Sequence, residues 1–287
     1  MRARALVQSC GIDSAPVEIT KFLPAANAEL QYSDRLASGV AGMTVPLGER
    51  NLILINKHDA SERQRFTALH EVAHILLDLP SAHDQDVDSA AMFSYARRPK
   101  EEIACDTFAA ECLLPHVLLQ QDLRDAIAGF EFISQLAEKY EVSLACTASR
   151  VAFNAPFACA YALSQDGFVR FSNSSPTMRA SRFFITPRIQ VPAASITGQC
   201  LKAGLPAGSG QVPAHLWTSA DDFGDIDLTE EVRISGTWGQ ALTLLWIEDG
   251  DLPDPRGERT TDAQSEGEPL LRELDGVLPW PGRGRRR

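Results

Sequence analysis

The residues of this chain best suited to chemistry are His70, Glu71 and His74, in the pentapeptide HEVAH. Two histidines four positions apart on an α-helix share one face and lie about 6 Å apart along its axis. Both imidazoles can then ligate one metal ion, which leaves Glu71 beside a water molecule at the open position. The opposing interpretation is that both histidines only pack or face solvent. We favour the metal site because the pattern needs all three polar residues in phase on one helix.

A helix over residues 60–79 is expected to position this motif. Asp59 or Ser61 can cap its start, and Pro80 ends it. Apolar side chains at helical spacing predict a buried stripe beside the histidines, formed by Phe66, Leu69, Ala73 and Leu76. A metal ion held beside that stripe would be partly buried.

A catalytic zinc site needs a third protein ligand, and a second helix over residues 100–114, bounded by prolines, offers candidates. We favour Glu102, because Asp106 lies four residues later on the same face and can accept the outer N–H of a ligating imidazole. Alternatively, Glu101 and Glu102 only sit in the first turn, where negative charge suits the helix dipole. That explanation accounts for either glutamate but not for the spacing to Asp106.

The composition is that of an ordinary globular protein, with 44% hydrophobic and 23% charged residues among 287. The net charge of −11 matches nucleic acid poorly, so direct DNA binding is not expected. The N-terminus lacks the apolar core of an export signal, and no run of about 18 apolar residues predicts a membrane span. We therefore expect a cytoplasmic protein without a membrane partner. Its six cysteines, none in a CxxC pair, are expected to be free thiols.

The chain divides into four predicted segments of an α+β protein. Residues 1–128 form the HExxH domain, with strands inside 28–57, and residues 129–153 form a helix pair. Residues 154–250 form a smaller α+β domain, and residues 251–287, rich in Asp, Glu, Gly, Pro and Arg, form a disordered tail. The smaller domain is marked by short β-rich runs between turns, at Ala158–Leu163, Phe168–Phe171, Arg182–Ile185 and Ala241–Ile247.

Residues 133–150 have the rhythm of a helix-turn-helix, in which Val142-Ser143 opens the second helix. A DNA-reading helix needs several basic side chains, and only Arg150 is present there. We therefore favour a helix pair that packs on the preceding domain. Three isolated histidines are interpreted as surface or hydrogen-bonded residues: His58, His116 and His215. Three tryptophans are interpreted as core residues: Trp217, Trp238 and Trp246.

Two stretches of the chain resemble the ImmA/IrrE family of zinc metallopeptidases, in which an FTxxHExxH helix precedes a helix reading E-x-x-A/C-N/D-x-F-A-A-x-L-L-M-P. Here residues 66–74 read FTALHEVAH, and residues 102–115 read EIACDTFAAECLLP. The chain departs from the family pattern at Leu114, where the family has Met, and at Asp106, where Asn is frequent. Neither departure removes a ligand.

This resemblance, good over residues 1–150 and weaker over 150–250, implies a zincin-like peptidase domain followed by a GAF-like sensor domain. It also implies a cytoplasmic protease that cuts a helix-turn-helix transcriptional repressor and so derepresses stress-response or mobile-element genes. Zinc is the expected metal for two His and one Glu, with manganese or iron as alternatives. The alternative function is a non-catalytic regulator or sensor that binds repressor or DNA and contains a structural metal.

In the expected reaction, Glu71 takes a proton from the water that attacks a peptide carbonyl and passes it to the leaving amine. Tyr95 and His83, between the two ligand helices, are candidates for oxyanion or substrate contact, although each is more often a surface residue. Residues 52–56 look like a strand, which can pair with an extended substrate at a sheet edge or lie inside the sheet.

Overall fold

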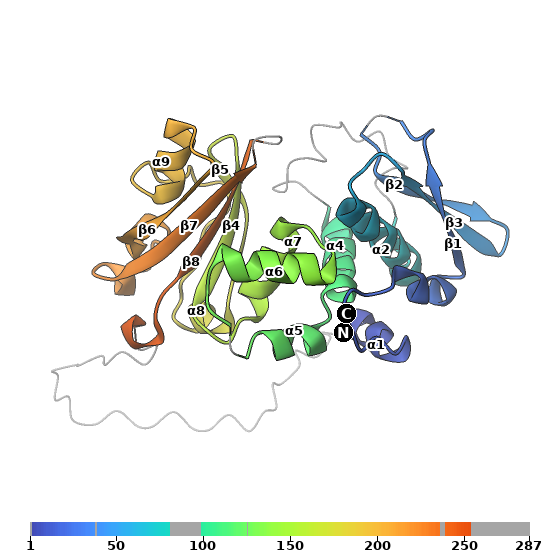
Figure 1. The fold of residues 1–287 in the computed structure, drawn as a ribbon, viewed down its shortest axis with the longest axis horizontal. Helices are drawn as coiled ribbons and strands as arrows, with labels where there is room; N and C mark the ends of the chain where they lie inside the picture. Colours follow the sequence, from blue (N-terminus) through green and yellow to red (C-terminus); the bar gives the residue numbers. More distant parts are fainter. Residues whose placement is uncertain (1, 38, 81–98, 125, 236–238, 254–287) are drawn as a thin grey trace, which may run out of the picture. The chain divides into compact units, whose positions relative to one another are not determined.

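The computed structural model describes residues 2–37, 39–80, 99–124, 126–235 and 239–253 (Figure 1). Within them, short strands and helices around the HExxH motif come first, and a five-stranded antiparallel sheet follows. The α+β class predicted from the sequence is confirmed. None of the helices in these segments has the length and apolarity that a membrane span requires. His83, Tyr95, Trp238 and residues 254–287 of the predicted tail lie outside the described residues.

The first sheet has three strands, β1 (Ala28–Ser33), β2 (Gly42–Leu47) and β3 (Arg50–Asn56). Their order is β1-β3-β2, with β3 parallel to β1 and antiparallel to β2. The strands predicted inside 28–57 are therefore confirmed. Because β3 has a neighbour on each side, its backbone groups are already paired, and of its two proposed placements the interior one is correct. Among the described strands, β2 and β1 form the edges.

Helix α2 (Ser61–Leu77) carries the HExxH motif and packs against β2, β3 and α4. The predicted side-chain caps at Asp59 and Ser61 are wrong, because Ala60 is the capping residue and it makes no side-chain cap hydrogen bond. Instead, the Gln64 amide donates to the carbonyl oxygens of residues 56, 57 and 59 and so holds the incoming chain. The helix ends in a left-handed residue, Asp78, at φ +54°.

Helix α4 (Lys100–Leu113) lies between two prolines, as predicted, since Pro99 precedes it and Pro115 follows it. Shorter helices support this pair. Helix α1 (Arg2–Ser9) packs on α4, and the 3-10 helix η1 (Ile19–Ala26) packs on α2.

The predicted helix pair is formed by α6 (Phe130–Tyr140) and α7 (Leu144–Asn154), with α5 (His116–Asp122) before it. Arg150, the basic residue of α7, is buried; its guanidinium lies 2.9 Å from the Glu111 carboxylate on α4 and donates to the Leu114 carbonyl oxygen. Helix α7 packs against α6, α5 and strands β4 and β5, and Arg150 joins it to α4, so packing explains the helix-turn-helix rhythm and this arginine is unavailable to DNA.

The second sheet has the strand order β5-β4-β8-β7-β6, and every pair in it is antiparallel. Its strands are β4 (Cys159–Gln165), β5 (Phe168–Ser174), β6 (Ala207–Pro213), β7 (Asp227–Ser235) and β8 (Gln240–Trp246). Helical segments connect them: α8 (Pro176–Ala180), α9 (Ile196–Ala203), η4 (Ala214–Leu216) and η5 (Asp221–Phe223), with η6 (Asp249–Asp251) after β8.

Sequence reasoning was less successful in this part of the chain. Residues 182–185 are not a strand, because Phe183 and Ile185 bury their side chains in irregular backbone after α8. Strands β6 and β7 were missed. β6 contains two glycines among its seven residues, and β7 has three charged side chains among its inner residues, so neither has the composition typical of a strand.

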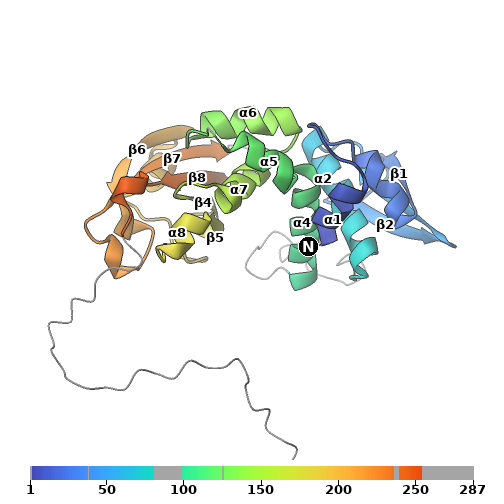
Figure 2. The same ribbon diagram turned by 90° about the horizontal axis from the view of Figure 1, so that it is seen from below.

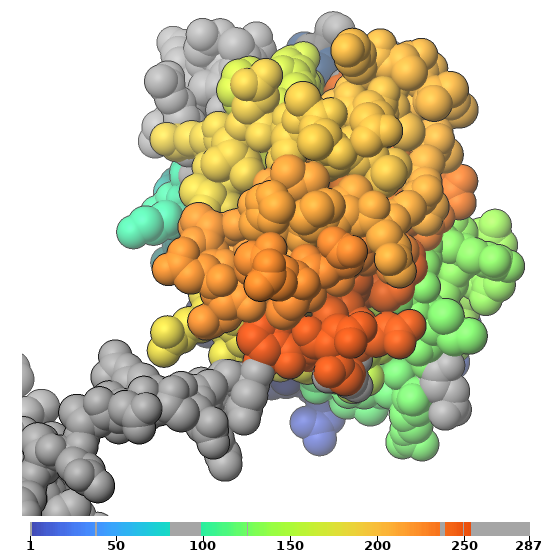
Figure 3. Space-filling view, turned by 90° about the vertical axis from the view of Figure 1, so that its left-hand side faces the viewer, coloured from blue at the N-terminus to red at the C-terminus, as the bar shows by residue number. Residues whose placement is uncertain are grey.

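The two faces of the second sheet bury different cores, because side chains alternate along each strand. One face joins the core that includes α2, α4 and α7, through Cys159, Tyr161, Leu163, Leu242 and Leu244. Helix α7 lies against this sheet (Figure 2). The other face buries Trp217 and Phe183 against Ala160 and Leu245, with Ile196 of α9 packed beside them. Residues late in the chain, coloured yellow to red in Figure 3, form most of the surface over that second core. Trp217 is thus a core residue, as predicted, whereas Trp246 is half-buried.

Candidate metal centre

Three potential ligands from helices α2 and α4 converge in the core of the first region, which comprises residues 2–154. The Nε2 atoms of His70 and His74, one helical turn apart on α2, lie 3.0 Å from each other. The Glu102 carboxylate on α4 places one oxygen 3.2 Å from the first Nε2 atom and the other 3.3 Å from the second. All three side chains are buried, and their ligating atoms lie within 4.8 Å of one another. The neighbouring Glu101 is only half-buried and is not part of this group.

Each histidine is oriented by an acceptor on its outer nitrogen. The Nδ1 atom of His70 lies 3.0 Å from Oδ1 of Asp106, one turn after Glu102 on α4. The Nδ1 atom of His74 lies 3.2 Å from the carbonyl oxygen of Leu79, which the left-handed turn after α2 carries back toward the helix. A carboxylate and a carbonyl can only accept, so both Nδ1 atoms carry the proton. When a metal ion is bound both rings are neutral, and their Nε2 lone pairs are the ones available to ligate it.

The electrostatics of this group favour a bound cation. Burial disfavours the charged form of His70, but the hydrogen bonds and charges of Asp106 and Glu102 outweigh that effect and raise its pKa to about 9. A positive charge in this buried space stabilises the Glu102 carboxylate, and a metal ion can supply that charge in place of the proton on His70. Two imidazole nitrogens and a carboxylate oxygen are also the donor set of catalytic zinc sites. The residues present fit a divalent zinc ion.

Glu71 directly follows His70 on α2 and is buried. Its Oε2 atom accepts a hydrogen bond of 2.8 Å from the hydroxyl of Thr44, which belongs to strand β2. This bond fixes the orientation of the Glu71 carboxylate, which is not one of the three candidate ligands. Sequence reasoning missed Thr44, since a threonine in a strand is too common to attract notice.

The isolated histidines of the described segments are not among the three candidate ligands. His58 and His215 are exposed, and Nδ1 of His116 lies 3.0 Å from the Asn154 side-chain oxygen. These positions agree with the surface or hydrogen-bonded roles expected for isolated histidines. All six cysteines are free, as predicted.

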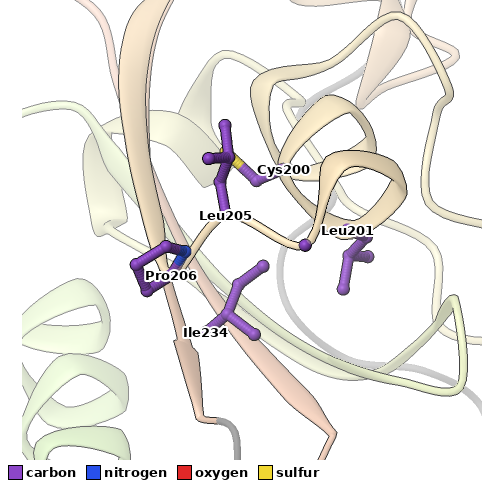
Figure 4. A pocket seen from close by; sticks show the side chains of 6 residues that line it. Cys200, Leu201, Leu205, Pro206 and Ile234 are labelled. Atoms are coloured by element: carbon purple, nitrogen blue, oxygen red, sulfur yellow. The ribbon is translucent and has the colours of Figure 1, made fainter.

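The second region is the five-stranded sheet with its connecting helices, residues 155–253. A small apolar pocket of about 210 Å³ opens there, between α9 and the ends of β6 and β7 (Figure 4). Its lining consists of Cys200, Leu201, Gly204, Leu205, Pro206 and Ile234. The Cys200 thiol is the reactive group there, and burial raises its pKa, which makes it a poor nucleophile. Unlike the His and Glu group, this pocket brings together no set of polar side chains.

Comparison with known proteins agrees with the motif. Residues 16–152 match the Peptidase_M78 family, described as the IrrE N-terminal-like domain. The radiation response metalloprotease IrrE of Deinococcus radiodurans is 30% identical over 146 residues, which are 46% of this chain and 43% of that protein. The chain thus matches less than half the length of this curated relative.

Among solved structures, a Mycobacterium tuberculosis transcriptional regulator is similar with a TM-score of 0.57. The match covers 86% of this chain and 75% of that chain, so it extends beyond residues 16–152. At 12% sequence identity it shows a shared fold alone.

Proposed function

Because residues 16–152 make this chain a member of the ImmA/IrrE family of metallopeptidases, we propose that it is a zinc-dependent endopeptidase. In this proposal His70, His74 and Glu102 hold the metal, Asp106 orients His70, and Glu71 is the general base. The observation that carries the proposal is the convergence of two correctly oriented imidazoles and one carboxylate in a buried site beside a second, separately held carboxylate.

The arrangement supports a catalytic site over a structural one. Structural zinc sites use four protein ligands, whereas catalytic sites use three and leave a position open. When bound, zinc would polarise the substrate carbonyl and lower the pKa of a coordinated water to about 7. Glu71 takes a proton from the water that attacks the peptide carbonyl, and it then donates that proton to the amine nitrogen as the C–N bond breaks. Manganese or iron would suit the same ligands less specifically.

The proposed substrate is an extended segment of a protein. Strand β2 is an edge strand among the described residues and lies against α2, so an added peptide strand can pair with it next to Glu71. Following the family resemblance, we propose that the substrate is a helix-turn-helix transcriptional repressor in the cytoplasm, and that its cleavage serves a stress response. The second sheet, with helices packed on it, is proposed to be a GAF-like sensor module.

The alternative, a non-catalytic regulator that binds DNA through the helix pair, has weaker support. Arg150 is the only basic residue of α7, and its guanidinium is buried against Glu111. DNA binding requires exposed cations along the reading helix.

The substitution Glu71→Gln tests the enzyme. It keeps the side-chain volume and the three candidate ligands but removes the base, so kcat should fall by about 10²–10⁴-fold. Glu62→Gln, on the first turn of the same helix, is the matched control and should retain full activity. The measurement is cleavage of a purified helix-turn-helix repressor that the wild-type protein cuts, with zinc content determined for each variant. Cleavage at the normal rate by the zinc-loaded Glu71→Gln protein would overturn the mechanism.

A further inference from the structure

We propose that Thr44 is the positioning residue for Glu71 and that it couples the orientation of this base to the strand on which a substrate peptide lies. The inference rests on the proposed function and adds a residue to it. Its starting point is the 2.8 Å hydrogen bond from the Thr44 hydroxyl to Oε2 of Glu71. Glu71 is 1% exposed, so its carboxylate is held by buried contacts and not by solvent.

The side chain of Thr44 lies on the buried face of its strand. Thr44 pairs with Ile53 of β3, and Gly42 pairs with Ile55. Residues directly opposite each other in an antiparallel pair project to the same face. Both isoleucines are fully buried, on the side of the sheet that α2 covers. Thr44 therefore places a hydroxyl among apolar neighbours, where Glu71 accepts its hydrogen bond.

The backbone of Thr44 faces the other way, toward the open edge of β2. The N–H of Asn56 donates to the carbonyl oxygen of Ala41, which makes that pair a hydrogen-bonded one. Because such pairs alternate along an antiparallel ladder, the pair of Thr44 and Ile53 is a non-hydrogen-bonded one. The N–H and C=O of Thr44 thus point away from β3. Pro46 lies two residues later and is therefore also in a non-hydrogen-bonded pair. Its nitrogen faces the open edge, where the missing N–H costs no hydrogen bond to β3.

Gly42 allows β2 to approach α2 closely enough for this contact. A Cβ atom at Gly42 would lie 2.6 Å from Cγ2 of Thr67 and 2.9 Å from Cδ1 of Ile55. A side chain at this position would therefore force its neighbours on α2 and β3 to shift. Thr67 precedes Glu71 by one helical turn, so the same close approach sets the separation between the Thr44 hydroxyl and Glu71.

Thr44 therefore contacts Glu71 through its side chain and can bind a substrate peptide through its backbone. A peptide that pairs with the outward N–H and C=O of Thr44 is placed in register with the residue whose hydroxyl aims the base. A hydrogen bond to a charged group typically contributes enough to change a rate by about 10–100-fold when it aligns a reacting group. Loss of the hydroxyl should misalign Glu71 without removing the backbone pairing, so kcat should fall while KM changes little.

Thr44→Val and Thr44→Ser separate this role from packing. Valine keeps the shape but removes the hydroxyl, and we expect about a 10–100-fold lower kcat with KM within about twofold of wild type. Serine restores the donor, so kcat should return to within a few fold of wild type. Zinc content should match wild type in both variants, because neither substitution touches a candidate ligand. The thermal midpoint of unfolding should fall in the valine variant, which leaves the buried Glu71 carboxylate without this donor, and should recover in the serine variant.

The inference is overturned if Thr44→Val turns over substrate at the wild-type rate, or if serine is as impaired as valine. It is also overturned if the valine variant loses zinc or raises KM in proportion to its loss of kcat/KM. Glu71→Gln, measured in parallel, distinguishes the two levels of the proposal. An active Glu71→Gln protein refutes the proposed function itself, whereas an inactive one beside a fully active Thr44→Val protein refutes only the role of Thr44.

Discussion

Two buried glutamates, one in each region of the molecule, show how differently a buried carboxylate can be stabilised. Glu230 on β7 is 0% exposed and accepts four hydrogen bonds. Its donors are all uncharged: the backbone N–H groups of Ile196 and Thr197, the Thr197 hydroxyl and the Trp217 indole N–H. Glu102 on α4 instead faces the Nε2 atoms of His70 and His74, both of which are potential metal ligands.

The difference separates a structural acid from a candidate ligand. At Glu230 every partner donates a proton, and two of them lie at the N-terminus of α9, whose dipole favours a negative charge. That site is complete without a ligand and connects α9, β7 and Trp217. At Glu102 the two imidazoles and the carboxylate can all act as metal ligands, so a metal ion can take the place of the proton that His70 otherwise carries. Burial alone therefore does not identify a functional carboxylate; the direction of its hydrogen bonds does.

The largest expected effect is on metal binding by Glu102→Gln. The amide keeps the volume but removes the negative charge, so zinc affinity should fall by more than the roughly 100-fold typical for loss of a supporting residue. Peptidase activity should fall with it. Glu101→Gln is the matched control on the same turn and should bind zinc normally. Zinc retained after dialysis against a graded series of chelators is the measurement. Equal retention by both variants would contradict the ligand role.

Glu230→Gln should instead weaken folding and leave the metal in place. The amide nitrogen turns a donor toward N–H groups that need acceptors, and each buried unpaired group costs about 1–3 kcal/mol. We expect a loss of about 3 kcal/mol in the free energy of unfolding, measured with urea. The adjacent Glu231, which accepts from the N–H of Phe130 and pairs with Arg233 at a less buried position, provides the control.

Glu231→Gln should cost less than about 1 kcal/mol, because its amide oxygen can still accept the Phe130 N–H. Comparable losses at positions 230 and 231 would mean that the hydrogen-bond network around Glu230 is not what stabilises this region. If folded Glu230→Gln protein lost zinc, Glu230 would contribute to metal binding as well as to folding.

The smallest effect is expected from Asp106, which acts through His70. Asp106→Leu removes the acceptor for Nδ1 and should lower zinc affinity by about 10–100-fold. Asp106→Asn keeps an oxygen acceptor for Nδ1 and therefore keeps the His70 tautomer. Its loss of zinc affinity should be close to about tenfold, the lower limit of that range. Competitive zinc titration of both variants provides the comparison. If asparagine proves as damaging as leucine, the charge of Asp106 matters more than its orientation of the ring.

Sequence reasoning succeeded where residues are related by the local geometry of one helix. The four-residue spacing of His70 and His74 predicts a shared face because a helix turns every 3.6 residues, and the same rule relates Glu102 to Asp106. Prolines at positions 80, 99 and 115 marked helix ends for the same local reason. In the second region the sequence did not predict β6 or β7, because β6 is rich in glycine and β7 in charged residues, and neither composition is typical of a strand.

The sequence by itself determined that His70, Glu71 and His74 share one helix and that Glu102 and Asp106 share the next, because helical periodicity is a property of neighbouring residues. Only the tertiary structure decided that Glu102, not Glu101, faces the imidazoles, that the Leu79 carbonyl orients His74, and that Thr44 holds Glu71. Those contacts depend on how α4 and β2 pack against α2. Packing is set by side chains far apart in the chain, and no spacing rule reports it.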